Sequence, residues 1–201
     1  MLIDFSPVRS GDIKLFDLAT HTTVDDLRLA TEAYFDALFD IINQASDEDI
    51  TFDPSDPEAH DPYAKLGEEH IGWNLGHLVV HVTASLEEDA AYSSILARGL
   101  PYPREPRLRY ETAWQTMTTQ EMALQRLAES RRMCLGYLST WPDTPFLDIF
   151  RDLSERFIER NGPQNAPAAY LMGLRHLDDH LGQFQEVYRQ ARAAAEGQSA
   201  D

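Results

Sequence analysis

Hydrophobic residues recur at intervals of three and four along four segments of the chain, which is the spacing of one face of an α-helix. These segments cover residues 22–41, 69–98, 118–138 and, after a turn at 162–167, the chain up to about residue 195. Thr22 followed by Asp25 and a capping box at 118–121 are start signals, and Gly99 with Pro101 is a stop signal. No segment alternates as a strand does. The pattern therefore predicts an all-α fold, a four-helix bundle with long connecting loops.

The remaining segments lack a sustained period. Residues 1–20 are expected to form an irregular, peripheral leader, and residues 196–201 a fraying tail. Residues 46–69 hold five aspartates and three prolines, which predicts a long acidic loop that can form part of a lid. A short amphipathic helix is expected around residues 150–158. A chain of 201 residues can bury a sizeable core, and a single domain over residues 1–201 is expected.

The second helix combines apolar residues on nearly every side with a single line of polar residues. On a helical wheel at about 100° per residue, this line falls within about 40°. Its members are His70, Asn74, His77, His81, Glu88 and Tyr92. Burying so many polar groups is costly unless they are paired or bound to a ligand. Two interpretations remain open: a hydrogen-bonded polar ladder between helices, or a metal site.

The fourth helix carries a second set of inward histidines. His176 and His180 are four residues apart and stand one turn above each other, with Gln183 one turn beyond. Both flank the apolar stripe of this helix and therefore face inward or toward a cleft. A metal site is the first hypothesis, and buried histidines bonded to a carbonyl or carboxylate are the alternative. Inward histidines on two separate helices favour the metal.

Cysteine usage limits the kind of metal site. Cys134 is the only cysteine, so neither an internal disulfide nor a thiolate cluster can form within one chain. Its place in the third helix indicates a buried structural thiol. A structural zinc site usually has four protein ligands that include cysteine, whereas three histidines leave coordination positions open for water or substrate. The composition thus favours a reactive site.

Charge disfavours several classes of partner. Acidic residues outnumber basic ones by 34 to 17, which gives a formal net charge of −17 and a pI near 4.6. Such a surface repels nucleic acids and anionic membranes. A short basic patch of Arg104, Arg107 and Arg109 is interrupted by prolines and is interpreted as a solvated loop. The chain shows no signal segment and no apolar run of membrane-spanning length, so a cytoplasmic protein is expected.

Two short motifs carry a resemblance to a known family. Residues 73–78 in the second helix read Trp-Asn-Leu-Gly-His-Leu, and the fourth helix reads His-x-x-x-His-x-Gly-Gln from His176 to Gln183. Together with Pro-Gln-Asn at 163–165, these motifs resemble the DinB/YfiT-like superfamily of metal-dependent four-helix-bundle proteins. The similarity extends over nearly the whole chain in helix order and spacing.

The resemblance implies a set of metal ligands. By position, His77, His176 and His180 match the three ligands of the family. His81 is an additional histidine that can support a ligand or carry a proton, although such a residue is more often a packed neighbour. The resemblance implies one divalent ion as the cofactor and a low-molecular-weight thiol as a cosubstrate. Imidazole suits several metals alike, and zinc or nickel is expected ahead of iron.

The resemblance also implies a pocket and a chemistry. Gln183 can orient a ligand or instead cap a backbone group, Trp73 can wall the pocket or belong to the core, and Asn74 completes the candidates. Proteins that this chain resembles include transferases of low-molecular-weight thiols, a thiol-dependent isomerase and hydrolases. The expected function is a metal-dependent enzyme acting on a small molecule, with thiol S-transfer ahead of hydrolysis, and a homodimer is expected. A non-catalytic binding module and a purely structural bundle are the alternatives.

Overall fold

The computed structural model describes residues 2–60, 67 and 69–198, and the regular structure of this part is entirely helical. Four helices are long: α3 (Val24–Ile42), α5 (Leu75–Ala97), α6 (Gln120–Leu138) and α8 (Ala166–Gln198). The predicted all-α bundle is thereby confirmed. None of the described helices combines the length and the hydrophobicity that crossing a bilayer requires.

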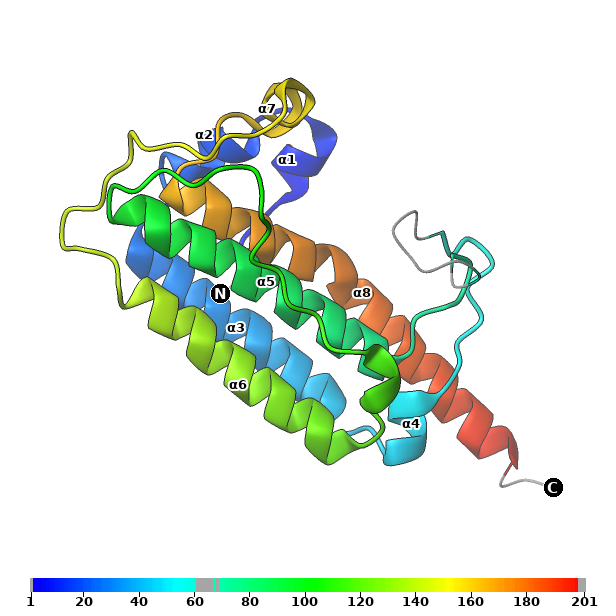
Figure 1. Ribbon diagram of the computed structural model, residues 1–201. Helices are drawn as coiled ribbons and strands as arrows, with labels where there is room; N and C mark the ends of the chain where they lie inside the picture. Colours follow the sequence, from blue (N-terminus) through cyan, green and yellow to red (C-terminus); the bar gives the residue numbers. More distant parts are fainter. Residues whose placement is uncertain (1, 61–66, 68, 199–201) are drawn as a thin grey trace.

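The long helices pack side by side around one core (Figure 1). α5 contacts α6 and α8, and α3 contacts the same two helices, so the cyclic order is α3, α6, α5, α8. The largest fully buried side chains include Tyr34, Phe35, Tyr170 and Phe184. Cys134 is buried in α6 as predicted, and burial raises the pKa of its thiol.

α5 and α8 form the most extensive contact of the bundle. They approach closely at Gly173, where an added Cβ would lie 2.8 Å from Leu86 Cδ1 and 3.1 Å from Leu86 Cα. Only glycine therefore fits at this separation without a shift of the neighbouring helix. Gly173 lies about one turn before His176 on α8, so the close approach occurs beside the predicted site.

Side-chain caps define the helix ends near the predicted positions. Thr23 caps α3 and forms a capping box with Asp26, and Thr119 caps α6, each one residue later than the predicted start. α5 ends where predicted, because Gly99 adopts a left-handed φ of 83°. Its N–H donates to the carbonyl of Leu96, which satisfies one of the last carbonyls of the helix.

The start of α5 differs from the prediction. The periodic pattern predicts a helix over 69–98, but α5 begins at Leu75. Asn74 caps the helix, with its Oδ1 accepting from His77 N at 2.8 Å. Before it, Gly72 passes so close to Pro54 that an added Cβ would lie 2.6 Å from the Pro54 carbonyl oxygen. This tertiary contact holds the preceding segment in a non-helical path.

The first twenty residues do not form the irregular, peripheral leader that the sequence predicts. They contain α1 (Ser6–Ser10) and α2 (Leu15–Ala19), and Phe5 and Leu15 are each 1% exposed. α2 packs on α8, and both short helices lie near α7 (Glu155–Asn161) at one end of the bundle (Figure 1). Helices of five residues are too short for a periodic apolar pattern, which explains why the sequence did not reveal them.

The other connecting segments are partly helical. α4 (Asp47–Thr51) opens the acidic segment and contacts α5 and α8. The predicted lid includes residues 61–66 and 68, which lie outside the described residues. The 3-10 helix η1 (Trp114–Thr116) precedes α6. α7 begins later than the short helix expected from residue 150. α8 extends through part of the expected tail, and residues 199–201 lie outside the described part.

Candidate metal centre

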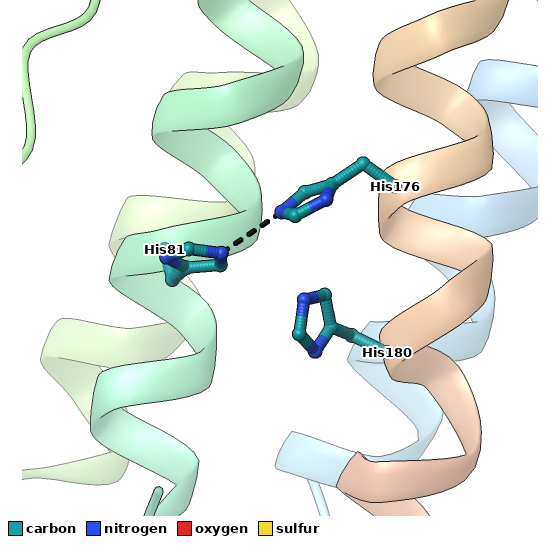
Figure 2. Close-up of side chains that lie close together, drawn as sticks. All are labelled: His81, His176 and His180. Carbon is teal, nitrogen blue, oxygen red and sulfur yellow. Dashed lines mark hydrogen bonds between the residues drawn. The ribbon is translucent and has the colours of Figure 1, made fainter. Parts of the chain in front are cut away.

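Three histidine side chains converge between α5 and α8. His81 extends from α5, and His176 and His180 extend from adjacent turns of α8, with their rings close together (Figure 2). One ring nitrogen from each lies within 4.8 Å of the other two, and His81 Nε2 is 2.9 Å from His176 Nε2. Among the described residues, this is the one group of histidine, cysteine and acidic side chains whose spacing suits a metal ion.

The spacing fits an ion after small side-chain movements. Zinc–imidazole bonds of about 2.0–2.1 Å at tetrahedral angles separate the ligand nitrogens by about 3.3 Å. The Nε2 atoms of His81 and His176 would therefore move apart by about 0.4 Å, and two ligand nitrogens at the upper limit of 4.8 Å would approach each other by about 1.5 Å. Side-chain rotations supply such movements without a shift of either helix. Because imidazoles are neutral, a bound ion would keep its positive charge.

Burial keeps the two histidines of α8 in the neutral form that metal binding requires. Burial, together with the neighbouring rings of His180 and His81, lowers the pKa of His176 to about 3. Burial also lowers the pKa of His180, against the opposing effect of its hydrogen bond to Gln183. Protons therefore compete with an ion for these two nitrogens only in acidic solution.

Gln183 fixes the ring of His180. Its Oε1 lies 2.9 Å from His180 Nδ1. Because an amide oxygen only accepts, Nδ1 carries the proton and Nε2 presents a lone pair. Hydrogen bonds of this kind orient metal-binding histidines and raise their basicity. The observed partner of the Gln183 side chain is thus a histidine ring and not a backbone group.

His81 has two outer partners that favour opposite positions of its ring proton. Arg109 Nη2 lies 3.1 Å from His81 Nδ1, and because arginine only donates, this contact places the proton on Nε2. Glu111 Oε1 lies 3.6 Å from the same Nδ1 and can only accept, which would free Nε2 for an ion. Although burial raises it, the neighbouring His81 ring and the hydrogen bonds from Arg109 lower the pKa of Glu111 to about 2. Glu111 is therefore a carboxylate at neutral pH.

His77 lies outside the histidine cluster. Its ring stacks on two indoles, with centroid distances of 4.4 Å to Trp73 and 4.9 Å to Trp114. The ligand set implied by the resemblance therefore differs from the observed cluster in one residue, because His81 occupies the place expected for His77. One helical turn moves a side chain by about 5.4 Å along the axis. That shift decides which histidine of α5 lies opposite His176.

The other predicted pocket residues have distinct positions. Trp73 borders the cluster, with ring-centroid distances of 4.4 Å to His81 and 5.6 Å to His180. Asn74 instead uses its side chain to cap α5. His70 precedes the helix, and its Nδ1 lies 2.9 Å from the Ala59 carbonyl oxygen. The predicted polar line thus starts outside the helix and reaches the site only at His81.

The far end of the polar line is a hydrogen-bonded ladder. Tyr92 donates to Glu88 Oε1 at 2.7 Å, and Arg107 Nε donates to the same oxygen at 3.1 Å. The backbone N–H of Arg109 also donates to it. The hydrogen bonds at Glu88 and Tyr92 lie within α5 and reach the segment after it, so they are not the predicted ladder between helices, whereas the candidate metal site lies at His81.

Two residues beside the site were not predicted, Arg109 and Glu111. The arginine-rich segment was expected to be a solvated loop, but Arg107 pairs with Glu88, and Arg109 pairs with Glu111 and donates to Ser85 Oγ. The available signal is the alternation of charged residues at 107, 109 and 111, because alternate residues of an extended segment lie on one side. Here that side faces α5.

Comparison with known proteins identifies the family of the chain. A family model described as the DinB superfamily matches residues 25–184, which include all three histidines of the cluster and His77. Searches of the curated proteins and of the solved structures found no match. Because the family model covers well over half of the chain, the protein belongs to the DinB superfamily.

Proposed function

We propose that this protein is a metal-dependent enzyme whose ion is held by His81, His176 and His180. The observation that carries this proposal is the convergence of three imidazoles whose nitrogens lie within 4.8 Å of one another. Three imidazole ligands leave coordination positions open. When bound, a divalent ion, zinc or nickel ahead of iron, supplies Lewis-acid chemistry by lowering the pKa of a thiol or water.

The residues around the histidines hold the ligands in place. Gln183 orients His180, and Glu111 is the acceptor that can orient His81. Trp73 borders the rings of His81 and His180. Arg109 lies beside His81 and pairs with Glu111, and so it holds that carboxylate next to the His81 ring.

We place thiol S-transfer ahead of hydrolysis as the reaction. The resemblance to thiol-dependent transferases supports this order, and a cavity of about 580 Å³ that borders His176 offers room for a second reactant. Hydrolysis is the second candidate, and a metal-binding or small-ligand-binding module without turnover is the third. A cytoplasmic location, a homodimer and the absence of a nucleic-acid partner belong to the same proposal, on the grounds of sequence and resemblance.

Metal content tests the site and its ligands. We expect about one ion per chain in protein purified without an affinity tag, stripped with a chelator and reloaded. His81→Ala and His176→Ala should lose the ion because each leaves only two ligands. His77→Ala is the matched control, since it removes a histidine of α5 outside the cluster. Elemental analysis and titration calorimetry measure the stoichiometry and the affinity.

Each result decides a separate part of the proposal. Loss of the ion in His77→Ala with retention in His81→Ala would restore the ligand set implied by the resemblance. No bound metal in any of the proteins would overturn the metal centre. Transfer of a small thiol to an electrophilic test substrate, absent in His176→Ala, supports the transferase. Metal binding without transfer or hydrolysis would support the non-catalytic binding module.

A further inference from the structure

A cleft runs along one side of α5 and α8 and ends beside the histidine cluster. Its volume is about 580 Å³, and its walls come from α5, from the arginine-rich segment after α5, from the segment leading into α7, and from α8. His176 lines the cleft, as does Arg109. A molecule bound in the cleft would therefore reach the candidate metal centre.

The cleft is rich in arginine although the chain as a whole is strongly acidic. Arg104, Arg107, Arg109 and Arg151 line it, in a protein of net charge −17. Arg107 and Arg109 are engaged by carboxylates. Among the described residues, neither Arg104 nor Arg151 has a carboxylate within ion-pair distance. Two guanidinium groups in the same cleft thus lack an anionic partner.

Arg151 is held in a fixed position with part of its hydrogen-bonding capacity unused. Its guanidinium carbon lies 3.5 Å from the centroid of the Tyr92 ring, a cation–π contact. Its Nε is buried and has no hydrogen-bond partner. Gln164, also in the cleft wall, is 3% exposed and has an unpartnered Oε1. Buried polar atoms without partners are uncommon, and these two require an acceptor and a donor respectively.

The lining of the cleft also includes a neutral acid and apolar side chains. Burial, with a contribution from Glu88, raises the pKa of Asp89 to about 8, so this carboxyl is largely protonated at neutral pH. A protonated carboxyl donates a hydrogen bond and does not repel an anion. Leu153, Phe157 and Met172 provide the apolar part of the lining. The cleft therefore suits an anionic head group attached to an apolar body.

We propose that this cleft binds a small organic carboxylate, with its carboxylate group between Arg104 and Arg151 and its apolar part extending toward His176. Arginine binds carboxylates through its N–H donors. The Arg104 side chain is exposed and forms no ion pair among the described residues, and Arg151 lies next to it, because its Nη2 donates to the Arg104 carbonyl oxygen at 3.5 Å. That the carboxylate is the substrate of the metal centre rests on the proposed function. That the cleft binds a carboxylate does not.

Binding of a matched pair of probes tests the cleft without reference to the metal. We expect 3-phenylpropionate to bind chelator-treated protein, as measured by ligand-observed NMR and titration calorimetry. Its neutral amide, 3-phenylpropionamide, has the same shape and should bind about ten- to a hundredfold more weakly, because hydrogen bonds to a charged group are lost. Equal affinity for the acid and the amide would overturn the proposal.

Variants distinguish a direct contribution of Arg104 and Arg151 to binding from a general effect of positive charge on the protein. Arg151→Gln and Arg104→Gln should each weaken binding of 3-phenylpropionate about tenfold or more and leave the amide unaffected. Arg104 is exposed, so its replacement tests the cleft even if Arg151→Gln fails to fold. Arg132→Gln is the control, since it removes an exposed arginine of α6 that does not line the cleft. Unchanged affinity in Arg104→Gln and in folded Arg151→Gln contradicts the site.

A paramagnetic ion distinguishes failure of the cleft from failure of the metal centre. In protein loaded with cobalt, the protons of bound 3-phenylpropionate should relax faster than in zinc-loaded protein, and His176→Ala should abolish the difference. Carboxylate binding without this faster relaxation would support the cleft as a binding site but contradict its connection to a metal at the histidines. Absence of carboxylate binding in chelator-treated protein rejects the cleft, whatever the metal content shows.

Discussion

The ring proton of His81 links metal binding to two residues outside the cluster. Without an ion, Arg109 favours the proton on Nε2, where it bonds to His176. An ion requires that nitrogen to be unprotonated, and Glu111 is the acceptor within reach of Nδ1. Metal binding thus requires the proton of His81 to move to the side of the ring that faces Glu111. The carboxylate, not only the three histidines, should set the affinity.

Glu111→Gln tests this role at the residue scale. The amide retains the shape of the side chain but loses the negative charge, so it supports a proton on His81 Nδ1 less strongly. We expect metal affinity to fall about tenfold or more while the stoichiometry stays the same. Titration with a competing chelator measures the affinity. Glu121→Gln, an exposed residue of α6, is the control, and equal affinity in both variants would exclude this role of Glu111.

At the scale of elements, the cluster depends on how closely α5 and α8 approach. Gly173 permits the approach, since a Cβ there would lie within 3.1 Å of the backbone of Leu86. The same helix carries Gly182, around which an added Cβ would meet nothing within 4 Å. Substitutions of Gly173 and Gly182 therefore separate the effect of close packing from that of helix propensity.

Gly173→Ala should separate α5 from α8 and so act on both stability and metal binding. We expect it to lower the free energy of unfolding by about 1–3 kcal/mol, the usual effect of overpacking, and to weaken metal binding. Gly182→Ala should be neutral or stabilising by up to about 1 kcal/mol, because alanine favours the helix. Urea denaturation measures both. Equal stability of the two variants would show that α5 and α8 can separate at Gly173 without loss of free energy of unfolding.

At the scale of the whole molecule, the free energy of unfolding should depend on pH through the carboxyl group of Asp89. Asp89 lies at the α5–α8 contact, and burial raises its pKa from 3.8 to about 8. Between these pH values the folded state binds more protons than the unfolded state, so the free energy of unfolding falls as pH rises. The contribution of Asp89 to stability is therefore more favourable at acidic pH than at alkaline pH.

Asp89→Asn removes this dependence. In chelator-treated protein, the variant and the wild type should differ least near pH 4, and the variant should become relatively more stable by about 1 kcal/mol or more by pH 8. Urea denaturation at a series of pH values measures the difference. Asp143→Asn, at an exposed position, is the control. A constant difference between Asp89→Asn and the wild type would show that Asp89 does not titrate in this range.

The periodic pattern predicted the long helices because each buries one apolar face, and a buried face has the same spacing wherever its partner lies. It did not predict α1 and α2, which are too short for a period. It also extended α5 back to residue 69. The contact of Gly72 with Pro54 ends the helix there, and residues so far apart in sequence leave no periodic signal.

The sequence by itself determined an all-α bundle of the DinB superfamily with histidines facing inward from its second and fourth long helices. It also placed His77 and His81 on one line of α5, because they are one helical turn apart. Only the tertiary structure decided that His81 meets His176 and His180. The choice depends on the axial position of α5 against α8, which follows from the extensive packing of the two helices, including the close approach at Gly173, and not from any periodicity along the chain.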